Sequence, residues 1–421
     1  MTNVTPSVIL LHPFGNNNVK QAALALAEAE LLEELWLGLG WSSNQKLESI
    51  LPKFIVRELN RRAYPEQVIS RMHNYPWFEI IRLLVTKSGV GRFKPLRNLP
   101  MFLTSVCLNK IDQKVGCIIK HSETVNAVYA YNGSALETFR NAKKLNVKCI
   151  YEMASAHPSF VKEIYEDEIT AHSLWVRSSI ECARQVRIDE ELSYADEIIV
   201  ASTFTKRSLD KAAEVKARIH TLPYGAPISD LIVLTRQRQN RNKLKVLYVG
   251  NLGLLKGIPY LLEAARLLGE KINLTLVGMP VGTPDNVMEE INSHTWIPSL
   301  PNSEVLSLMR HHDVLILPSL TDGFGLVILE ALSHGLPVIA TVNSGAPDVI
   351  TEGEDGFIVP IRSAEAIAEK IDLLEGDRDL LDLMSKNAVR RAAELSWDSY
   401  RHCFVNLVKS FLPDFEDKID K

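Results

Sequence analysis

The sequence predicts two doubly wound α/β domains, and three observations support this prediction. Its 421 residues exceed what one hydrophobic core usually supports, so two domains of roughly 200 residues each are expected. Short β-branched apolar runs alternate with longer helical patterns, which is typical of parallel sheets covered by helices on both faces. A polar, basic stretch interrupts this alternation near the middle of the chain.

The expected strands follow one another as short apolar runs. They are residues 8–12, 125–131, 147–152 and 197–202 in the first half, and 244–250, 272–278, 313–319 and 336–341 in the second. Residues 222–243 contain two prolines and a glycine before a basic run and are the best linker candidate. We therefore expect an N-terminal domain over 1–225, a linker over 226–243 and a C-terminal domain over 244–396. Such sheets bind ligands at the carboxyl ends of their strands, which predicts a site in a cleft between the domains.

Composition narrows the class of protein. With 46% hydrophobic and 23% charged residues the chain is typical of a soluble globular protein, and a net charge of −4 argues against general nucleic-acid binding. Its five cysteines are scattered and form no CxxC pair, which fits a reducing, cytoplasmic setting. The first apolar run, at 7–11, lacks the flanks of a signal peptide, and no run is long enough for a transmembrane helix.

One stretch, residues 53–97, is strongly basic. It carries ten Lys or Arg against three Glu, with six aromatic residues among them. This pattern suggests a surface that contacts an anionic membrane from the cytoplasmic side. The alternative is a solvated helix face.

The stretch "SLTDGFGLVILEALSHGLPVIATVNSGAPDVI", residues 319–350, carries the clearest chemistry. A buried strand ends near Ser319, a glycine turn follows, and a helix begins near Gly325. The free N–H groups at a helix start suit a phosphate or pyrophosphate. Asp322 lies in the turn and Glu330 about 1.5 helical turns into the helix, so they could bind hydroxyls at opposite ends of one elongated ligand. Alternatively, Asp322 caps the helix and Glu330 is a surface residue.

This segment resembles the E-x7-E signature of glycosyltransferase family 4, which comprises retaining enzymes of the GT-B fold. Asp322 stands where the first glutamate usually is. The resemblance implies that Glu330 binds the ribose of a nucleoside diphosphate sugar and that Asp322 binds the transferred sugar. The residues between and beside them that it assigns to the donor are Gly323, Phe324, Gly325, Leu326 and Val327.

A second segment, "VLYVGNLGLLKGIPYLLEAARLL" at 246–268, resembles the strand, glycine turn and helix of the same family. Lys256 occupies the position of a lysine that binds the donor pyrophosphate, and Gly250 marks the turn. The family usually has an arginine after this glycine, whereas this chain has Asn251. Stabilisation of the leaving group would then rest on Lys256 and helix N-termini, or on an arginine elsewhere. The alternative for Lys256 is a solvated lysine at a helix start.

Further resemblances place more residues at the cleft. Trp296 and Ile297 lie where the family binds the nucleobase, although a hydrophobic strand end explains Trp296 nearly as well. Asp348 is expected to be a helix-start carboxylate rather than a ligand contact. By resemblance the last helical segment, 397–421, returns to the N-terminal domain, which would bind the acceptor.

Three motifs of the first half resemble the family's cleft residues. "LLHPFGNNNVKQAALAL" at 10–26 places Gly15 and Asn16 in a loop that approaches the donor phosphate, unless it is only an Asn-rich helix cap. "YEMASAHPSF" at 151–160 places His157 where the family has a histidine near the reacting sugar carbon. Asn132, at another strand end, is a candidate acceptor contact, with a plain turn as the alternative.

The resemblance implies transfer of a sugar from a nucleoside diphosphate sugar to a hydroxyl, with retention, and with His157, Lys256 and Asp322 nearest the chemistry. It implies no cofactor and no metal, and the sequence shows no cluster of metal ligands. Two rival hypotheses remain: a nucleotide-sugar epimerase of the same fold, which needs no acceptor, and a non-catalytic nucleotide-sugar-binding protein. The second is motivated by Asn251 and Asp322.

Overall fold

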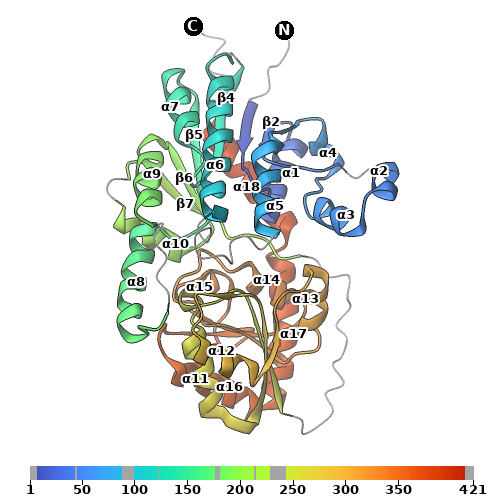
Figure 1. Cartoon of the computed structure of the whole chain (residues 1–421), viewed down its shortest axis with the longest axis vertical. Coiled ribbons are helices and arrows are strands. Elements are labelled where there is room, and N and C mark those ends of the chain that lie inside the picture. The colour runs from blue at the N-terminus through green and yellow to red at the C-terminus, as the bar shows by residue number, and fades with distance from the viewer. Residues whose placement is uncertain are drawn as a thin grey trace.

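The structure is a computed structural model that describes residues 7–42, 45–87, 99–122, 124–175, 181–212, 215–227 and 243–412. Two parallel sheets divide the chain into an N-terminal and a C-terminal domain, drawn above and below each other in Figure 1. Most of the predicted linker lies outside the described residues, as do residues 88–98 of the basic stretch and residues 413–421 at the end of the chain.

The N-terminal domain is built on seven parallel strands. Their order across the sheet is β3 (Met72–Asn74), β2 (Leu32–Leu37), β1 (Ser7–Leu11), β4 (Val125–Tyr131), β5 (Lys148–Met153), β6 (Glu197–Val200) and β7 (Arg218–Thr221). The helices of this half are α1 (Asn17–Glu28), α2 (Gln45–Ile50), α3 (Lys53–Asn60), α4 (Glu66–Ile69), α5 (Pro76–Lys87), α6 (Leu99–Ile119), α7 (Leu136–Lys144), α8 (Pro158–Ala171), α9 (Glu181–Tyr194) and α10 (Thr203–Ser208), followed by the 3-10 turn η3 (Leu209–Lys211).

The C-terminal domain is built on six parallel strands. Their order is β12 (Thr295–Ile297), β10 (Ile272–Val277), β8 (Leu244–Val249), β13 (Val314–Leu317), β14 (Val338–Thr341) and β15 (Gly356–Val359), and β9 (Leu252–Gly253) pairs separately with β11 (Pro280–Val281). Its helices are α11 (Ile258–Leu268), α12 (Asp285–Asn292), α13 (Asn302–Met309), α14 (Leu326–Ser333), α15 (Ala346–Val349), α16 (Ala364–Gly376) and α17 (Arg378–Glu394), with 3-10 turns η4 (Leu254–Lys256) and η5 (Gly269–Lys271).

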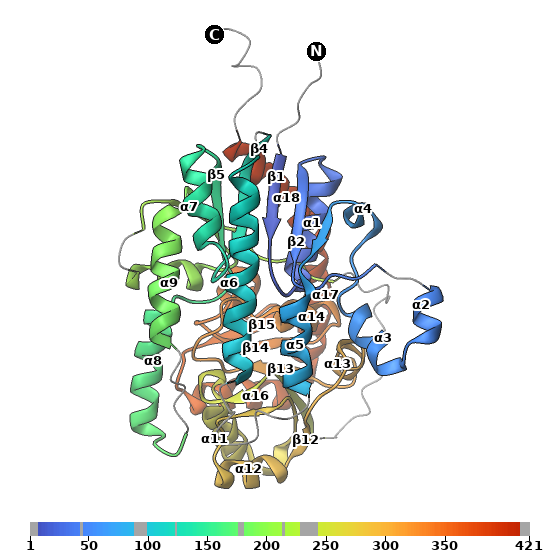
Figure 2. The same cartoon turned by 45° about the horizontal axis from the view of Figure 1, so that its top comes forward.

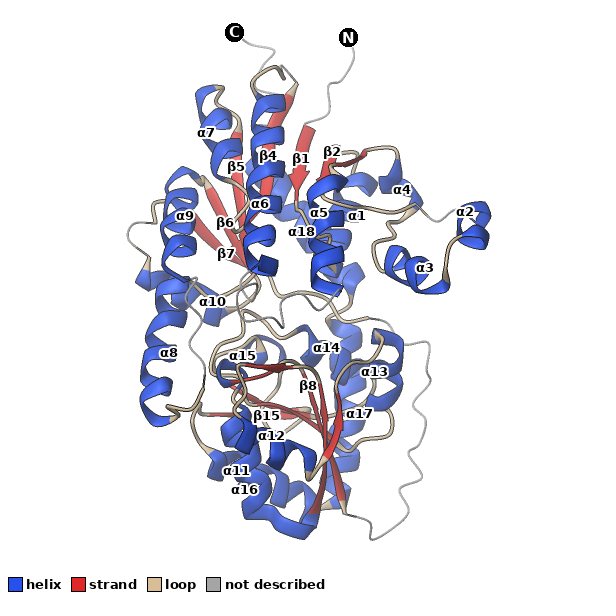
Figure 3. Cartoon of the chain, viewed as in Figure 1, coloured by secondary structure: helices blue, strands red, loops and turns tan. Residues whose placement is uncertain are grey.

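The apolar runs form strands because helices cover both faces of each sheet. Strands β1, β6, β13 and β14 are buried along their whole length. In Figure 3 the helices surround the strands of each domain, and Figure 2 shows α5 and α6 side by side over the N-terminal sheet. The predicted doubly wound α/β architecture of both domains is confirmed. Within the described residues, no helix combines the length and apolar character needed to cross a bilayer.

The chain passes between the domains at two places that lie against each other. Ala226 N donates to Leu395 O (2.6 Å), and Trp397 N donates to Ala226 O (3.2 Å). Beyond the second crossing, α18 (Trp397–Phe411) packs against α1 of the N-terminal domain. The Phe404 ring of α18 contacts the Tyr129 ring of β4 at 5.3 Å between centroids. The end of the described chain is therefore part of the N-terminal domain's packing.

Helix α10 of the N-terminal domain docks on the C-terminal domain. The backbone N–H and hydroxyl of Thr203 donate to Asp348 Oδ2 (2.9 and 3.1 Å). Arg207 donates to Val342 O (3.2 Å). Asp348, in the first turn of α15 as expected, is therefore also the capping partner of a helix in the other domain. The two domains meet through directional polar contacts as well as apolar packing.

Candidate functional site

Two connected cavities lie between the domains, and they collect most of the predicted residues. The smaller, of about 310 Å³, we call the Asp322 cavity; the larger, of about 580 Å³, we call the Glu330 cavity. Asn16 and Leu326 line both. The predicted residues that line the Asp322 cavity are Asn16, Gly250, Lys256, Asp322, Phe324, Gly325, Leu326 and Val327. Those that line the Glu330 cavity are Gly15, Asn16, Leu326 and Glu330.

The turn after β13 is shaped by backbone hydrogen bonds and glycines. Asp322 N donates to Asn343 O (2.9 Å), and Gly345 N donates to Phe324 O (2.7 Å), so the turn is tied to the loop after β14. Gly325 has a left-handed φ of +81°, and a Cβ there would lie 2.7 Å from the Leu317 side chain. Because only glycine takes this conformation without strain, the turn can bring the start of α14 to the cavity wall.

Gly323 fixes the turn against the N-terminal domain. A Cβ on Gly323 would lie 2.2 Å from Ala154 O, which leaves no room for any side chain. Its carbonyl oxygen accepts hydrogen bonds from the hydroxyls of Ser202 and Thr205, the latter at 2.8 Å. Gly323 is thus held against the N-terminal domain next to Asp322, and its predicted contact with the donor stays a prediction.

Lys256 and Asp322 form an ion pair in the Asp322 cavity, with 2.5 Å between Nζ and Oδ2. Lys256 is held there by the turn at Gly257, which has a φ of +71°. The turn passes so close to Pro318, the residue after β13, that a Cβ on Gly257 would lie 1.9 Å from Pro318 O. The side chains of Lys256 and Asp322 remain 31% and 19% exposed. Both are thus within reach of a ligand, and a partly exposed pair of this kind contributes at most about 1 kcal/mol to stability.

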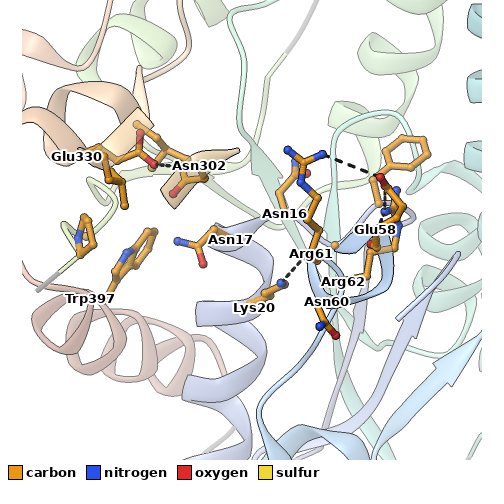
Figure 4. A pocket seen from close by; sticks show the side chains of 16 residues that line it. Asn16, Asn17, Lys20, Glu58, Asn60, Arg61, Arg62, Asn302, Glu330 and Trp397 are labelled. Carbon is orange, nitrogen blue, oxygen red and sulfur yellow. Dashed lines mark hydrogen bonds and ion pairs between the residues drawn. The ribbon is translucent and has the colours of Figure 1, made fainter. Parts of the chain in front are cut away.

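Glu330 projects from α14 into the larger cavity. Asn302 Nδ2 donates to Glu330 Oε1 (3.0 Å), and Figure 4 shows this contact on the C-terminal wall, facing Asn16 and Arg61. Burial raises the pKa of Glu330, and the hydrogen bond from Asn302 opposes this rise. Oε1 thus already accepts one donor in a half-buried setting, and the carboxylate can accept further hydroxyl donors from a ligand.

His12, which sequence reasoning did not single out, shapes the loop on the opposite wall. Its Nδ1 accepts hydrogen bonds from Gly15 N (2.9 Å) and Phe14 N (3.1 Å). Burial lowers the pKa of His12 to about 3, so the ring is neutral. The Gly15 N–H, expected to face a phosphate, is therefore directed at His12, and Asn16 of the same loop lines both cavities. The signal in the sequence was the histidine three positions before the glycine.

A buried carboxylate supports the floor of the Asp322 cavity. Glu152 accepts hydrogen bonds from the hydroxyls of Tyr129 and Tyr224 and from Asn18 Nδ2 (3.3 Å). Burial raises the pKa of Glu152. Asn18 and Tyr224 both line the cavity, so this network fixes two lining residues that come from helix α1 and from the first domain crossing. None of these residues was predicted, because strands far apart in sequence bring them together.

His157 and Asn132 are bonded inside the N-terminal domain. His157 is fully buried and caps α8: its Nδ1 accepts from Ser159 N (3.3 Å), and its Nε2 bonds Asp189 Oδ1 (3.0 Å). Asn132 bonds the backbone of Ala154 (3.3 Å). Neither is among the described residues that line the two cavities. Both ring nitrogens of His157 have protein partners here, and its catalytic role stays a prediction.

Three predicted donor residues of the C-terminal domain also lie outside the described linings. The Trp296 indole N–H donates to Gly278 O (2.9 Å), which fixes the ring to the edge of the sheet, and Ile297 follows it in β12. Asn251 is exposed, and its carbonyl accepts from the Tyr248 hydroxyl (2.8 Å). Within the described residues, no group of three or more His, Cys, Asp or Glu side chains could hold a metal ion.

Comparison with known proteins finds a family similarity in the C-terminal half of the chain. Residues 234–391 match the family model described as glycosyl transferases group 1. The chain is 29% identical to a D-inositol 3-phosphate glycosyltransferase of Corynebacterium urealyticum over 54% of this chain and 60% of that protein. It is 27% identical to an uncharacterized glycosyltransferase of Methanocaldococcus jannaschii over 85% of this chain and 92% of that protein. Several other curated relatives are matched over less than half of their length.

Solved structures extend the likeness to the whole chain. HepE from Anabaena, solved in complex with UDP-glucose, is 14% identical and superposes with a TM-score of 0.61 over 96% of this chain and all of that one. The fold is GT-B.

Proposed function

We propose that the chain is a retaining glycosyltransferase that moves a sugar from a nucleoside diphosphate sugar to a hydroxyl acceptor, in the biosynthesis of a glycan, polysaccharide or glycolipid. The observation that carries the proposal is the row of Lys256, Asp322 and Glu330 along two connected cavities at the carboxyl ends of the C-terminal strands. One cation for a diphosphate, one carboxylate for a sugar and one carboxylate for a ribose match the parts of a nucleoside diphosphate sugar.

In this proposal the ion pair opens when the donor binds. Lys256 moves from Asp322 to the diphosphate, and Asp322 then accepts hydrogen bonds from hydroxyls of the transferred sugar. Glu330 accepts hydrogen bonds from the ribose diol, with Asn302 holding its other side. The short distance between Lys256 and Asp322 supports this exchange, because one ligand can then reach both side chains. Such a ligand replaces the single contact between them by two contacts to itself.

The chemical step then needs little from the protein beyond position and charge. The acceptor oxygen bonds to the anomeric carbon as the bond from that carbon to the phosphate oxygen breaks, and the released diphosphate takes the acceptor proton on the same face. Lys256 and the N–H groups at the start of α14 stabilise the negative charge on the leaving group. His157 has no place in this scheme, since its ring is buried and bonded to Asp189.

The decisive experiment compares variants of the cavity residues with matched surface variants. We expect Glu330→Ala and Lys256→Ala each to reduce turnover of the donor at least tenfold, about 1.4 kcal/mol of transition-state stabilisation. Glu289→Ala and Lys386→Ala remove the same side chains from exposed positions of the same domain and are expected to leave turnover unchanged. Sugar transfer at the wild-type rate by both cavity variants would refute the site.

The same assay separates the two rival hypotheses. Conversion of the donor to an isomeric nucleotide sugar without any acceptor would favour an epimerase. Nucleotide binding by calorimetry with no turnover of any donor would favour a non-catalytic binding protein. This hypothesis is worth testing because Asn251, which is exposed, stands where a second cation is expected. A thermal-shift screen of nucleoside diphosphates against the wild-type protein identifies the base.

A peripheral membrane contact belongs to the same proposal. Helices α5 and α6, side by side in Figure 2, expose large apolar side chains, with Trp77 70%, Leu84 66% and Phe102 63% accessible. They suit the interface of a membrane. Flotation with anionic vesicles tests this contact, and a Trp77→Ser/Leu84→Ser variant is expected to stay unbound.

A further inference from the structure

A third cavity adjoins the Glu330 cavity and is lined by cations. It measures about 580 Å³, and we call it the Lys53 cavity. It shares the lining residues Asn60, Arg61 and Asn302 with the Glu330 cavity, so the two cavities are neighbours. Its cations are Lys53, Arg57 and Arg61, against the single carboxylate of Glu48, which leaves a formal charge of 3 − 1 = +2 on the wall.

The three cations share one face of one helix. Lys53, Arg57 and Arg61 are spaced at i, i+4 and i+8 along and just beyond α3, so their side chains lie above one another and repel. Lys53 is also the first residue of α3, where the helix dipole disfavours a positive charge. This arrangement weakens the helix on its own and becomes favourable when an anion lies among the side chains.

The described neighbours neutralise this face only in part. Arg61 approaches Glu58 only to 4.0 Å and its side chain remains 56% exposed, while Lys53 and Arg57 are exposed on the helix surface. Arg62, the next residue, differs sharply: it is only 13% exposed and lies between Glu58 and Glu79. Arg62 is thus paired inside the domain, whereas Arg61 keeps one long ion pair with Glu58 and a mostly exposed side chain at the cleft, as Figure 4 shows.

The opposite wall belongs to the C-terminal domain and also favours a negatively charged ligand. Pro301, Asn302 and Ser303, at the start of α13, close the cavity across from α3. The first N–H groups of a helix have no acceptor within the helix, and the helix dipole places partial positive charge there. An anion in this cavity would therefore meet positive groups from both domains.

We propose that the Lys53 cavity binds the phosphoryl group of the acceptor substrate. This inference rests on the proposed function, which places the donor in the two neighbouring cavities and leaves this one for the second substrate. Arginine and lysine side chains bind phosphoryl oxygens through charge-assisted hydrogen bonds, and three of them match a dianion or diphosphate. The phosphoryl group belongs either to a small phosphorylated acceptor or to the headgroup of a lipid acceptor.

The test measures binding of two phosphoryl probes to the full chain by calorimetry and by vesicle flotation. The probes are glycerol 3-phosphate in solution, with glycerol as its neutral match, and vesicles that contain phosphatidylglycerol. We expect Lys53→Ala/Arg57→Ala to weaken binding of the phosphoryl probe at least tenfold. Lys114→Ala/Lys120→Ala removes the same charge from exposed positions within and just beyond α6 and is expected to bind as the wild type does.

The outcomes separate this inference from the proposed function. We expect Lys256→Ala to lose nucleoside diphosphate binding but keep the phosphoryl probe, and the α3 variant to show the reverse. If neither the wild type nor any variant binds a nucleoside diphosphate, while the α3 variant alone loses the phosphoryl probe, only the proposed function fails. If the α3 variant binds the probe as tightly as the wild type, or the wild type binds neither probe, the Lys53 cavity is not a phosphoryl site.

The two probes also distinguish the source of the phosphoryl group. Binding of glycerol 3-phosphate in solution, sensitive to the α3 variant, assigns a small phosphorylated acceptor. Binding to vesicles alone, with the same sensitivity, assigns a lipid acceptor. Alanine is the residue most favourable in a helix, so the α3 variant is expected to fold, and its thermal midpoint without ligand is expected to equal or exceed that of the wild type because repulsion along α3 is relieved.

Discussion

The two walls of the cleft are built in different ways. On the C-terminal wall, glycines shape two strand-turn-helix segments. In one, Asp322 in the turn is close in sequence to Glu330 in the helix. In the other, Lys256 is followed directly by Gly257. On the N-terminal wall, the loop at Gly15 is held by His12, and the floor is held by Glu152 through Tyr224 and Asn18. One wall is set by local backbone geometry and the other by buried polar contacts between distant segments.

This difference accounts for what each wall can tolerate. A glycine with positive φ and no space beside it admits no other residue, so the C-terminal wall depends on single positions. A buried polar network depends on the protonation and the hydrogen-bonding capacity of several side chains, so the N-terminal wall depends on pH and on partners. The comparison predicts steric failure on one wall and electrostatic failure on the other.

The largest effect is expected from Gly257→Ala on the C-terminal wall. The new Cβ would lie 1.9 Å from Pro318 O while φ is +71°, so the backbone beside Lys256 must shift. We expect the free energy of unfolding to fall by about 3 kcal/mol, because both overpacking and left-handed strain act. Urea denaturation of the wild type and variant measures this fall.

Gly353→Ala is the matched control for that prediction. Gly353 has a similar φ of +77°, but a Cβ added there would meet nothing within 4 Å, so only the backbone strain remains. We expect a loss of about 1 kcal/mol. Equal losses for Gly257→Ala and Gly353→Ala would show that the close approach to Pro318 has no energetic consequence and would break the comparison.

A smaller, pH-dependent effect is expected from His12 on the N-terminal wall. Burial lowers the pKa of His12 from 6.5 to about 3, so below pH 6.5 the unfolded chain binds a proton that the folded chain does not. The stability from the neutral ring is fully present above pH 6.5 and is lost as the pH falls from 6.5 toward 3. At pH 5 the loss amounts to about 2 kcal/mol.

The measurement compares unfolding free energies at pH 7.5 and pH 5. We expect the wild type to lose about 2 kcal/mol more than His12→Gln, in which the side-chain oxygen can still accept the Gly15 N–H but cannot be protonated. His121→Gln, at an exposed position on the other side of the domain, is expected to follow the wild type. A pH dependence of His12→Gln that equals the wild type's would show that the ring does not titrate with folding.

The sequence predicted the C-terminal wall better than the N-terminal wall, for a physical reason. The eight expected runs correspond to β1, β4, β5, β6, β8, β10, β13 and β14, because their apolar residues are contiguous. Strand β2 was missed since Glu33 and Glu34 interrupt its apolar pattern, and the short edge strand β3 lacks one. Asp322, Lys256 and Glu330 could be placed in the cleft because each lies on a strand-turn-helix unit that carries its own geometry.

The remaining site residues depend on contacts that no local pattern encodes. Glu152 reaches Tyr224 across 72 positions, and Arg61 faces Asn302 of the other domain. His157 shows the limit of such patterns: a histidine at a strand end fitted a catalytic role, and only the folded chain reveals that Asp189 and Ser159 bond both of its ring nitrogens. Local geometry is readable from spacing, whereas the choice of partner in a buried network needs the folded chain.

The smallest effect is expected where the two walls join, at Thr203 and Asp348. The hydroxyl of Thr203 donates to Asp348 Oδ2 across the domain boundary (3.1 Å), beside the turn that carries Asp322. A double-mutant cycle of Thr203→Val and Asp348→Ala is expected to give a coupling free energy of about 1 kcal/mol in urea denaturation, since the hydroxyl bonds a charged acceptor. Thr203→Val combined with Glu354→Ala, which removes an exposed carboxylate of the same domain as Asp348, is expected to be additive. Zero coupling between Thr203 and Asp348 would show that this hydrogen bond does not link the two walls energetically.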